Sequence, residues 1–265
     1  MKLGFIGIGN QATAMLKGIV RTKALFVTDI YAYDVDAERL RNSAETFGLQ
    51  PCADAAGVSS VCDAVLFAVK PHQIEAVLAQ IAAAVQASKP LVISMAAGVS
   101  LERLAAGLPE GAAIVRIMPN QNAAIAQSMT AYCHNGAPTA EQIQMTETIC
   151  RAFGEVLPLD EAYFSAFFVL AGAGPAFAFL FIDQLARAGV KIGMSRQLAQ
   201  KTAAQTVLGS AQLILESGAH PQELIDRVCS PGGITIEGLA ALQENGFEHA
   251  VNQAVERAFE KEKKL

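Results

Sequence analysis

The chain has 265 residues, just over half of them apolar and none of them tryptophan. This length exceeds that of a usual single domain, so we expect two domains with alanine-rich cores. A net charge of −5 gives no general attraction to nucleic acid and argues against such a partner. The five cysteines form no CxxC pair and are odd in number, which indicates reduced thiols rather than a disulfide framework.

The N-terminal stretch MKLGFIGIGN is too short and too broken by glycine for a signal peptide, so we expect a cytoplasmic protein. The four histidines are scattered without metal-ligand spacing, and no metal centre is expected.

Residues 1–160 alternate short apolar runs with helical patterns. The predicted strands are KLGFIG (2–7), DIYAYD (29–34), AVLFAV (64–69), LVISMA (91–96), AIVRIM (113–118), MTAYCH (129–134) and EVLPLD (155–160). The predicted helices between them are Gln11–Arg21, Asp36–Phe47, His72–Val85, Leu101–Ala106 and Glu141–Phe153. Apolar strands separated by helices predict an α/β fold, with a doubly wound, mainly parallel sheet covered on both faces.

After residue 160 the strand signal ends and only helical patterns follow. The predicted helices are Ala162–Ala188, Ser195–Glu216, Pro221–Val228, Ile234–Gln243 and Phe247–Lys264. The chain therefore divides, by prediction, into an α/β domain over 1–160 and an all-helical domain over 161–265.

One helical segment, residues 162–182, carries no charge along its whole length. Its length alone would allow a membrane span. Its small residues, Pro175 and the absence of a second span favour a helix buried in the protein or in an oligomer interface. We therefore expect a homodimer or higher homo-oligomer without membrane association.

The first chemical motif, Gly7-Ile8-Gly9-Asn10-Gln11-Ala12, lies between a predicted strand and a predicted helix. It matches the dinucleotide fingerprint G-x-G-x-x-G/A, in which the glycines allow a tight turn and the approach of a pyrophosphate. The alternative is a glycine turn without a ligand. Asp34 ends the next strand and suits the ribose hydroxyls of NAD, whereas Arg39 and Arg41 could compensate a 2′-phosphate. The sequence leaves NADH and NADPH both open.

Further strand ends carry candidate coenzyme contacts. Lys70 ends one strand, small residues follow another in SMAAG (94–98), and Asn120 follows a third. Carboxyl ends of strands in doubly wound sheets face the ligand crevice. The alternatives are an exposed Lys70 before a helix that starts at Pro71, and an ordinary turn at Asn120.

The loop CSPGGIT, 229–235, places two adjacent glycines directly before a helical pattern. Gly232 and Gly233 free the backbone where a helix begins, and the first amides of that helix lack partners and favour an anion. Thr235 adds a hydroxyl group. The alternative is Ser230 as an ordinary N-cap with Pro231 at the first helical position.

With the fingerprint, AVKP, SMAAG and SPGGIT, the chain resembles the pyrroline-5-carboxylate reductases from end to end, most specifically over 220–243. The resemblance implies a Rossmann domain and a helical dimerisation domain, with an active site where the two meet across a dimer. It also implies reduction of 1-pyrroline-5-carboxylate to L-proline with NADPH or NADH, the last step of proline biosynthesis.

The resemblance extends to individual residues. By position it implies coenzyme contacts at Ile6, Gly7, Ile8, Gly9, Asn10, Gln11, Ala12, Ala68, Val69, Lys70, Pro71, Met95, Ala96 and Ala97. It implies a catalytic and substrate-binding role for Glu161, beside the ring nitrogen, and for Thr235, with Ser230, Gly232, Gly233 and Ile234 in the substrate loop. Departures from the family pattern are Ala171 and Ala173 in place of serines, Phe168 in place of threonine and Ala55 in place of asparagine.

Two other functions stay open. Related hydroxyacid dehydrogenases carry a catalytic lysine four residues after a glycine in the interdomain helix, where this chain has Ala176. A non-catalytic protein that senses a dinucleotide would share the first motif but not the substrate loop.

Overall fold

The computed structural model describes residues 1–264. These form two compact units, one of Met1–Ala173 with the end of the chain from Glu262 on, the other of Gly174–Lys261. The boundary that the sequence predicts between an α/β domain, 1–160, and a helical domain, 161–265, stays a prediction.

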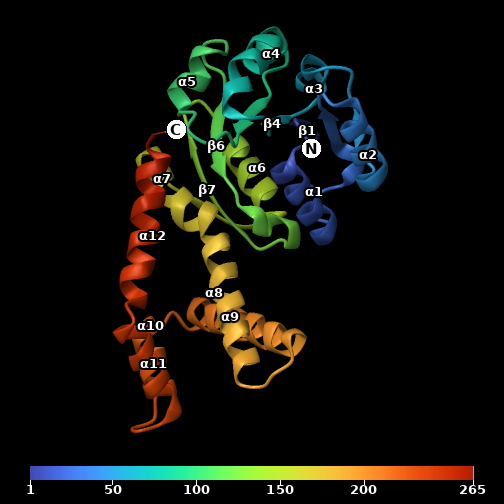
Figure 1. The fold of residues 1–265 in the computed structure, drawn as a ribbon. Coiled ribbons are helices and arrows are strands. Elements are labelled where there is room, and N and C mark those ends of the chain that lie inside the picture. Colours follow the sequence, from blue (N-terminus) through green and yellow to red (C-terminus); the bar gives the residue numbers. More distant parts are fainter. Residues whose placement is uncertain (265) are drawn as a thin grey trace. The chain divides into compact units, whose positions relative to one another are not determined.

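An eight-stranded sheet, in the order β3-β2-β1-β4-β5-β6-β7-β8, forms the centre of the first unit (Figure 1). Its strands are β1 Leu3–Ile6, β2 Ile30–Tyr33, β3 Gln50–Pro51, β4 Ala64–Phe67, β5 Leu91–Ser94, β6 Ile114–Met118, β7 Ser128–His134 and β8 Gly154–Pro158. Every pairing is parallel except that of β6 with β7. The doubly wound, mainly parallel sheet is confirmed.

Helices cover both faces of this sheet. They are α1 Asn10–Thr22, α2 Ala37–Phe47, α3 Ala55–Val61, α4 Ile74–Ser88, α5 Leu101–Ala106, α6 Ala140–Arg151 and α7 Phe164–Phe167, followed by a π-helical turn at Phe168–Ala173. Successive side chains of a strand point to opposite faces of the sheet, so they pack in two separate hydrophobic cores. Phe5 packs in one core with α1 and α6, whereas Ile6 and Phe67 pack in the other with α3, α4 and α5. Two buried faces explain why the strands read as continuous apolar runs.

Gly18, in the middle of α1, lies where a side chain cannot fit. A Cβ atom there would lie 2.3 Å from the carbonyl oxygen of Ala123 and 2.7 Å from Cβ of Phe153. Gly18→Ala is therefore expected to lower the free energy of unfolding by about 3 kcal/mol, although alanine is the better helix former. Urea unfolding measures this loss. Lys17→Ala, at the exposed neighbouring position, is the control and should stay close to the parent protein.

The second unit is all-helical. It contains α8 Gly174–Lys191, α9 Arg196–Ser217, α10 Pro221–Val228, α11 Ile234–Glu244 and nearly all of α12 Phe247–Glu262. Its buried core consists of three alanines, Ala186, Ala199 and Ala203, where α8 packs on α9. Large apolar side chains such as Leu180, Leu208 and Leu215 stay exposed. A second apolar surface is a groove of about 500 Å³ lined mainly by residues of α8 and α12.

One helical run of the described chain, Glu161–Lys191, has the length and composition of a membrane span, and 6% of its most apolar window is buried inside the chain. A single run of this kind is weak evidence for a membrane. One copy of the chain therefore does not bury this segment. Of the two predicted environments, the protein interior and an oligomer interface, this exposure favours the interface.

Candidate dinucleotide and substrate sites

The turn after β1 requires a glycine at position 7. Gly7 has φ of 91°, and a Cβ atom there would lie 2.8 Å from the carbonyl oxygen of Ala68. Its N–H donates to the carbonyl oxygen of Tyr33 at 2.8 Å, which holds the turn against β2. The left-handed backbone and the close approach to β4 both exclude a larger residue.

The helix that follows this turn presents open amides. Gly9 is the N-cap of α1, and no side chain caps the helix. A Cβ atom at Gly9 would meet nothing closer than the carbonyl oxygen of Ala68 at 4.0 Å. Ala12 is fully buried under the helix. Free N–H groups at a helix start, beside open space, fit the pyrophosphate of a dinucleotide.

The other strand ends predicted for the coenzyme lie at the same edge of the sheet. Ala68–Pro71 follow β4, and Met95–Ala97 follow β5. The strand order reverses between β1 and β4, which is the position where doubly wound folds bind their ligands. Lys70 is exposed, and Pro71 begins a short 3-10 helix, Pro71–Gln73. Contacts of these residues with a coenzyme stay predictions.

Asp34, at the end of β2, is 6% exposed, and its carboxylate is engaged by its own chain. The N–H of Ile8 donates to Oδ2 at 2.7 Å, and the N–H of Asp36 donates to Oδ1 at 2.9 Å. Asp34 thus ties the glycine turn to the end of β2. The structure shows this internal role of Asp34, and its contact with a ribose stays a prediction.

Asn120 is also buried and engaged within the first unit. Its Nδ2 donates to the carbonyl oxygen of Ala171 at 2.8 Å, in the π-helical turn, and its Oδ1 accepts from the N–H of Asn122 at 3.0 Å. Gln11 of the glycine loop donates to the carbonyl oxygen of Asn120 at 2.9 Å. The structure therefore joins two predicted coenzyme residues to the turn at which this unit ends.

Glu161 lies in the first unit, where it pairs with Arg116. Nη1 of Arg116 donates to Oε1 of Glu161 at 2.8 Å, and the N–H of Leu101, at the start of α5, donates to the same oxygen at 2.8 Å. The guanidinium lies 4.7 Å from the centre of the Phe164 ring, and the Arg116 side chain is 8% exposed. The sequence analysis did not predict Arg116 as the partner of Glu161. The signal was present, because Arg116 is the charged residue within the apolar strand AIVRIM and a buried charge needs a partner.

Removing the charge of Glu161 is expected to destabilise the first unit. Glu161→Gln keeps an acceptor for the N–H of Leu101 but leaves the buried guanidinium of Arg116 without a counter-charge, at a cost of about 2 kcal/mol in unfolding free energy. Chemical unfolding measures this change. Asp160→Asn is the matched control because asparagine still caps the N–H of Ala162. Unchanged stability with a lower kcat would instead support the predicted role beside the substrate nitrogen.

All five cysteines are free. Burial raises the pKa of Cys62 and of Cys133 to about 12, and burial also raises the pKa of Cys150. These three thiols are therefore protonated at neutral pH and are poor nucleophiles. Among residues 1–264, no cluster of three or more histidine, cysteine or acidic side chains could hold a metal ion.

The predicted substrate loop lies in the second unit. Gly232 has φ of 66°, and α11 begins at Ile234 with Gly233 as its N-cap and without a capping side chain. The alternative with Ser230 as the N-cap is wrong, since Ser230 only accepts a turn hydrogen bond of 3.0 Å from the N–H of Gly233. Thr235 is exposed one residue into the helix. The loop thus offers unpaired amides and a hydroxyl group together.

A doubly wound sheet with an open, glycine-bounded helix start at its switch point is typical of the dinucleotide-binding domains of oxidoreductases. Two family models match the chain. One, described as NADP oxidoreductase coenzyme F420-dependent, matches residues 2–98, and the other, described as pyrroline-5-carboxylate reductase dimerisation, matches residues 161–265.

The chain is 38% identical to pyrroline-5-carboxylate reductase of Escherichia coli, over 100% of this chain and 98% of the relative. The structure of the Streptococcus pyogenes enzyme is 36% identical, has a TM-score of 0.88 and covers 100% of this chain and 99% of that one. The Plasmodium falciparum enzyme, solved with NADP bound, is 30% identical with a TM-score of 0.88, over 99% and 97%. The chain belongs to the pyrroline-5-carboxylate reductase family.

Proposed function

We propose that this protein reduces 1-pyrroline-5-carboxylate to L-proline with NADPH or NADH, as the last step of proline biosynthesis. The observation that carries the proposal is an uncapped helix start at Gly233–Ile234 in a chain similar to the reductases over its full length. The relatives' names state the reaction, and the loop has the chemistry to hold a carboxylate.

Each half of the reaction has its residues. The glycine loop, Gly7–Ala12, binds the coenzyme, because its open amides can donate hydrogen bonds to a pyrophosphate. When bound, the reduced nicotinamide supplies the hydride. The loop from Ser230 to Thr235 fixes the substrate carboxylate through peptide amides and a hydroxyl group. Because a protonated imine is already electrophilic, the protein mainly supplies orientation, an effect worth about 7–11 kcal/mol in favourable cases.

Glu161 has structural partners within the first unit as well as its proposed role beside the substrate. One of its oxygens already binds Arg116 and the N–H of Leu101, while about a third of its side chain stays exposed. In the proposed role, its negative charge favours the cationic form of the ring nitrogen. The Glu161→Gln variant described above separates this role from the structural one.

Mixing the protein with NADPH or NADH and pyrroline-5-carboxylate tests the reaction, with the nicotinamide absorbance as the readout. Loss of absorbance with formation of proline is the expected result. Coenzyme binding without turnover would instead indicate a sensing protein, and turnover of a hydroxyacid alone would indicate a related dehydrogenase. Either outcome would contradict the proposal.

The dimerisation family match and the exposed apolar faces of the second unit support a homo-oligomer. We propose that its smallest form is a homodimer in the cytoplasm, with neither a membrane nor a nucleic acid as partner. Sedimentation at micromolar concentration tests the assembly, and a monomer under these conditions would contradict it. Recovery of the protein with the membrane fraction after lysis without detergent would contradict the location.

A further inference from the structure

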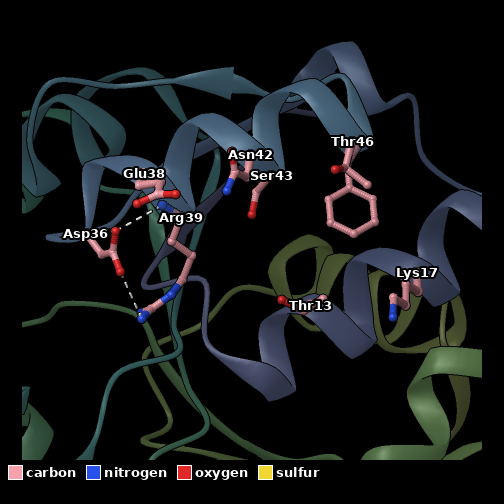
Figure 2. Close-up of a pocket in the computed structure, with 9 residues that line it drawn as sticks. Thr13, Lys17, Asp36, Glu38, Arg39, Asn42, Ser43 and Thr46 are labelled. Carbon is pink, nitrogen blue, oxygen red and sulfur yellow. Dashed lines mark hydrogen bonds and ion pairs between the residues drawn. The ribbon is translucent and has the colours of Figure 1, made fainter.

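A polar pocket of about 440 Å³ lies between α1 and α2 (Figure 2). Thr13 and Lys17 of α1 line one side of it, and residues from Asp36 to Phe47 line the other. Figure 2 shows Asp36 and Arg39 together at one end, with Lys17 at the other end. Arg39 pairs with Asp34, and Asp34 accepts a hydrogen bond from the N–H of Ile8 in the glycine loop, so the end with Asp36 and Arg39 is the end close to the dinucleotide site.

Arg39 is shared between two carboxylates at this end. Its Nη1 lies 3.4 Å from Oδ2 of Asp34, and its Nη2 lies 3.1 Å from Oδ2 of Asp36. The Asp34 side chain is 4% exposed, whereas those of Asp36 and Arg39 are 44% and 50% exposed. Glu38 lines the same pocket. The accessible groups here therefore carry a net negative charge, although an arginine is present.

The start of α2 is closed to an anion as well. Asp36 is the N-cap of α2, and its Oδ1 accepts the N–H of Arg39 at 3.0 Å. The positive pole that a helix start offers is thus already neutralised by an acidic side chain. This end of α2 contrasts with the start of α1, which no side chain caps.

The adenosine ribose of a bound dinucleotide lies at the end of the second strand in folds of this kind. The hydrogen bond from the N–H of Ile8 to Asp34 places that strand end directly against the glycine loop. A 2′-phosphate carries a charge of about −1.5 to −2 and would meet Asp36 at the end of the pocket where the lining cation, Arg39, is already paired with two carboxylates. The neutral 2′-hydroxyl of NADH can instead donate to the carboxylate of Asp36, whose side chain is 44% exposed.

From this arrangement, which rests on the proposed function, we infer that the protein prefers NADH to NADPH and that Asp36 is the residue that determines this preference. Asp34 supports the preference only indirectly, because it holds Arg39 against the strand end. The preference arises from the residues around Asp36 in this chain, and the glycine loop plays no part in it.

Binding of two probes that contain no nicotinamide, ADP and 2′,5′-ADP, tests the inference by titration calorimetry on the full-length protein. ADP is expected to bind at least about tenfold more tightly than 2′,5′-ADP at low ionic strength. Asp36→Ser keeps an N-cap for α2 but removes one negative charge and frees Arg39 from one of its two carboxylate partners. The affinity ratio should then move about tenfold towards 2′,5′-ADP, and the ratio of kcat/KM for NADPH over NADH should move in the same direction.

Glu38→Gln is the matched control, because it removes one negative charge from the same pocket and leaves the Asp36–Arg39 pair intact. In Glu38→Gln, the ratio of the affinities for ADP and 2′,5′-ADP should change less than about threefold, as expected for an exposed charge screened by salt. Equal or tighter binding of 2′,5′-ADP to the parent protein overturns the inference and leaves the proposed function intact. An equal shift in Glu38→Gln overturns the role of Asp36. Binding of neither probe overturns the coenzyme site itself, and the inference with it.

Discussion

Gly9→Ala is expected to fold like the parent protein and to lose its coenzyme. The backbone of Gly9 has φ of −75°, which alanine adopts without strain, and the nearest atom to a Cβ there is 4.0 Å away. The space that the Cβ would fill is the space through which a pyrophosphate reaches the first amides of α1. The dissociation constant for NADH should therefore rise at least about 100-fold.

Nucleotide titration and thermal unfolding separate these two expectations. Gly7→Ala is the informative comparison, because it adds a methyl group 2.8 Å from a backbone oxygen at a φ of 91° and should lose both stability and binding. Parent-like affinity in Gly9→Ala would show that the glycine loop does not hold the coenzyme. Such a result would contradict the coenzyme-binding part of the proposed function.

Thr235→Ala is expected to raise the KM for pyrroline-5-carboxylate and to lower kcat, each by about tenfold or more. The loss of a hydrogen bond to a charged group costs about 1.5–3 kcal/mol, which supports an effect of this size. Thr235 is exposed at the start of α11, so its removal should leave folding unchanged.

Steady-state kinetics with saturating NADH measure this effect. Thr235→Ser, which keeps the hydroxyl group, should recover most of the activity and thereby separates hydrogen bonding from packing. If the kinetics of Thr235→Ala match those of the parent protein, the substrate is not held at this loop. The coenzyme affinity should be unaffected in both variants, because the residues proposed for coenzyme binding lie in the other unit.

Most of the fold could be predicted because its central strands, β1, β4, β5 and β6, are buried along their whole length. All seven predicted strands are present, and α5 and α10 have the predicted bounds. The strand β3, Gln50–Pro51, and the helix α3, Ala55–Val61, were missed. A strand of two exposed residues has no periodicity to read, and α3 is too short to show a helical repeat.

The backbone of the two candidate loops was predictable from their glycines, whereas the ligand contacts of these loops stay predictions. Gly7 and Gly232 both have positive φ, and Gly9 and Gly233 both cap a helix without a side chain. Side-chain pairing was not predictable, because it depends on distances between residues far apart in the sequence. The hydrogen bonds of Asn120 to Ala171 and of Arg116 to Glu161 join separate elements, and local sequence patterns do not contain them.

The alanine core of the second unit also bears on how this protein behaves in solution. Three buried alanines bury too little apolar surface to offset the chain entropy of five helices. We expect the remaining stabilisation to come from other copies of the chain that cover the exposed leucines and phenylalanines. We therefore expect thermal stability to rise with protein concentration by mass action, and we expect the helices to unfold when dilution separates the assembly into single chains.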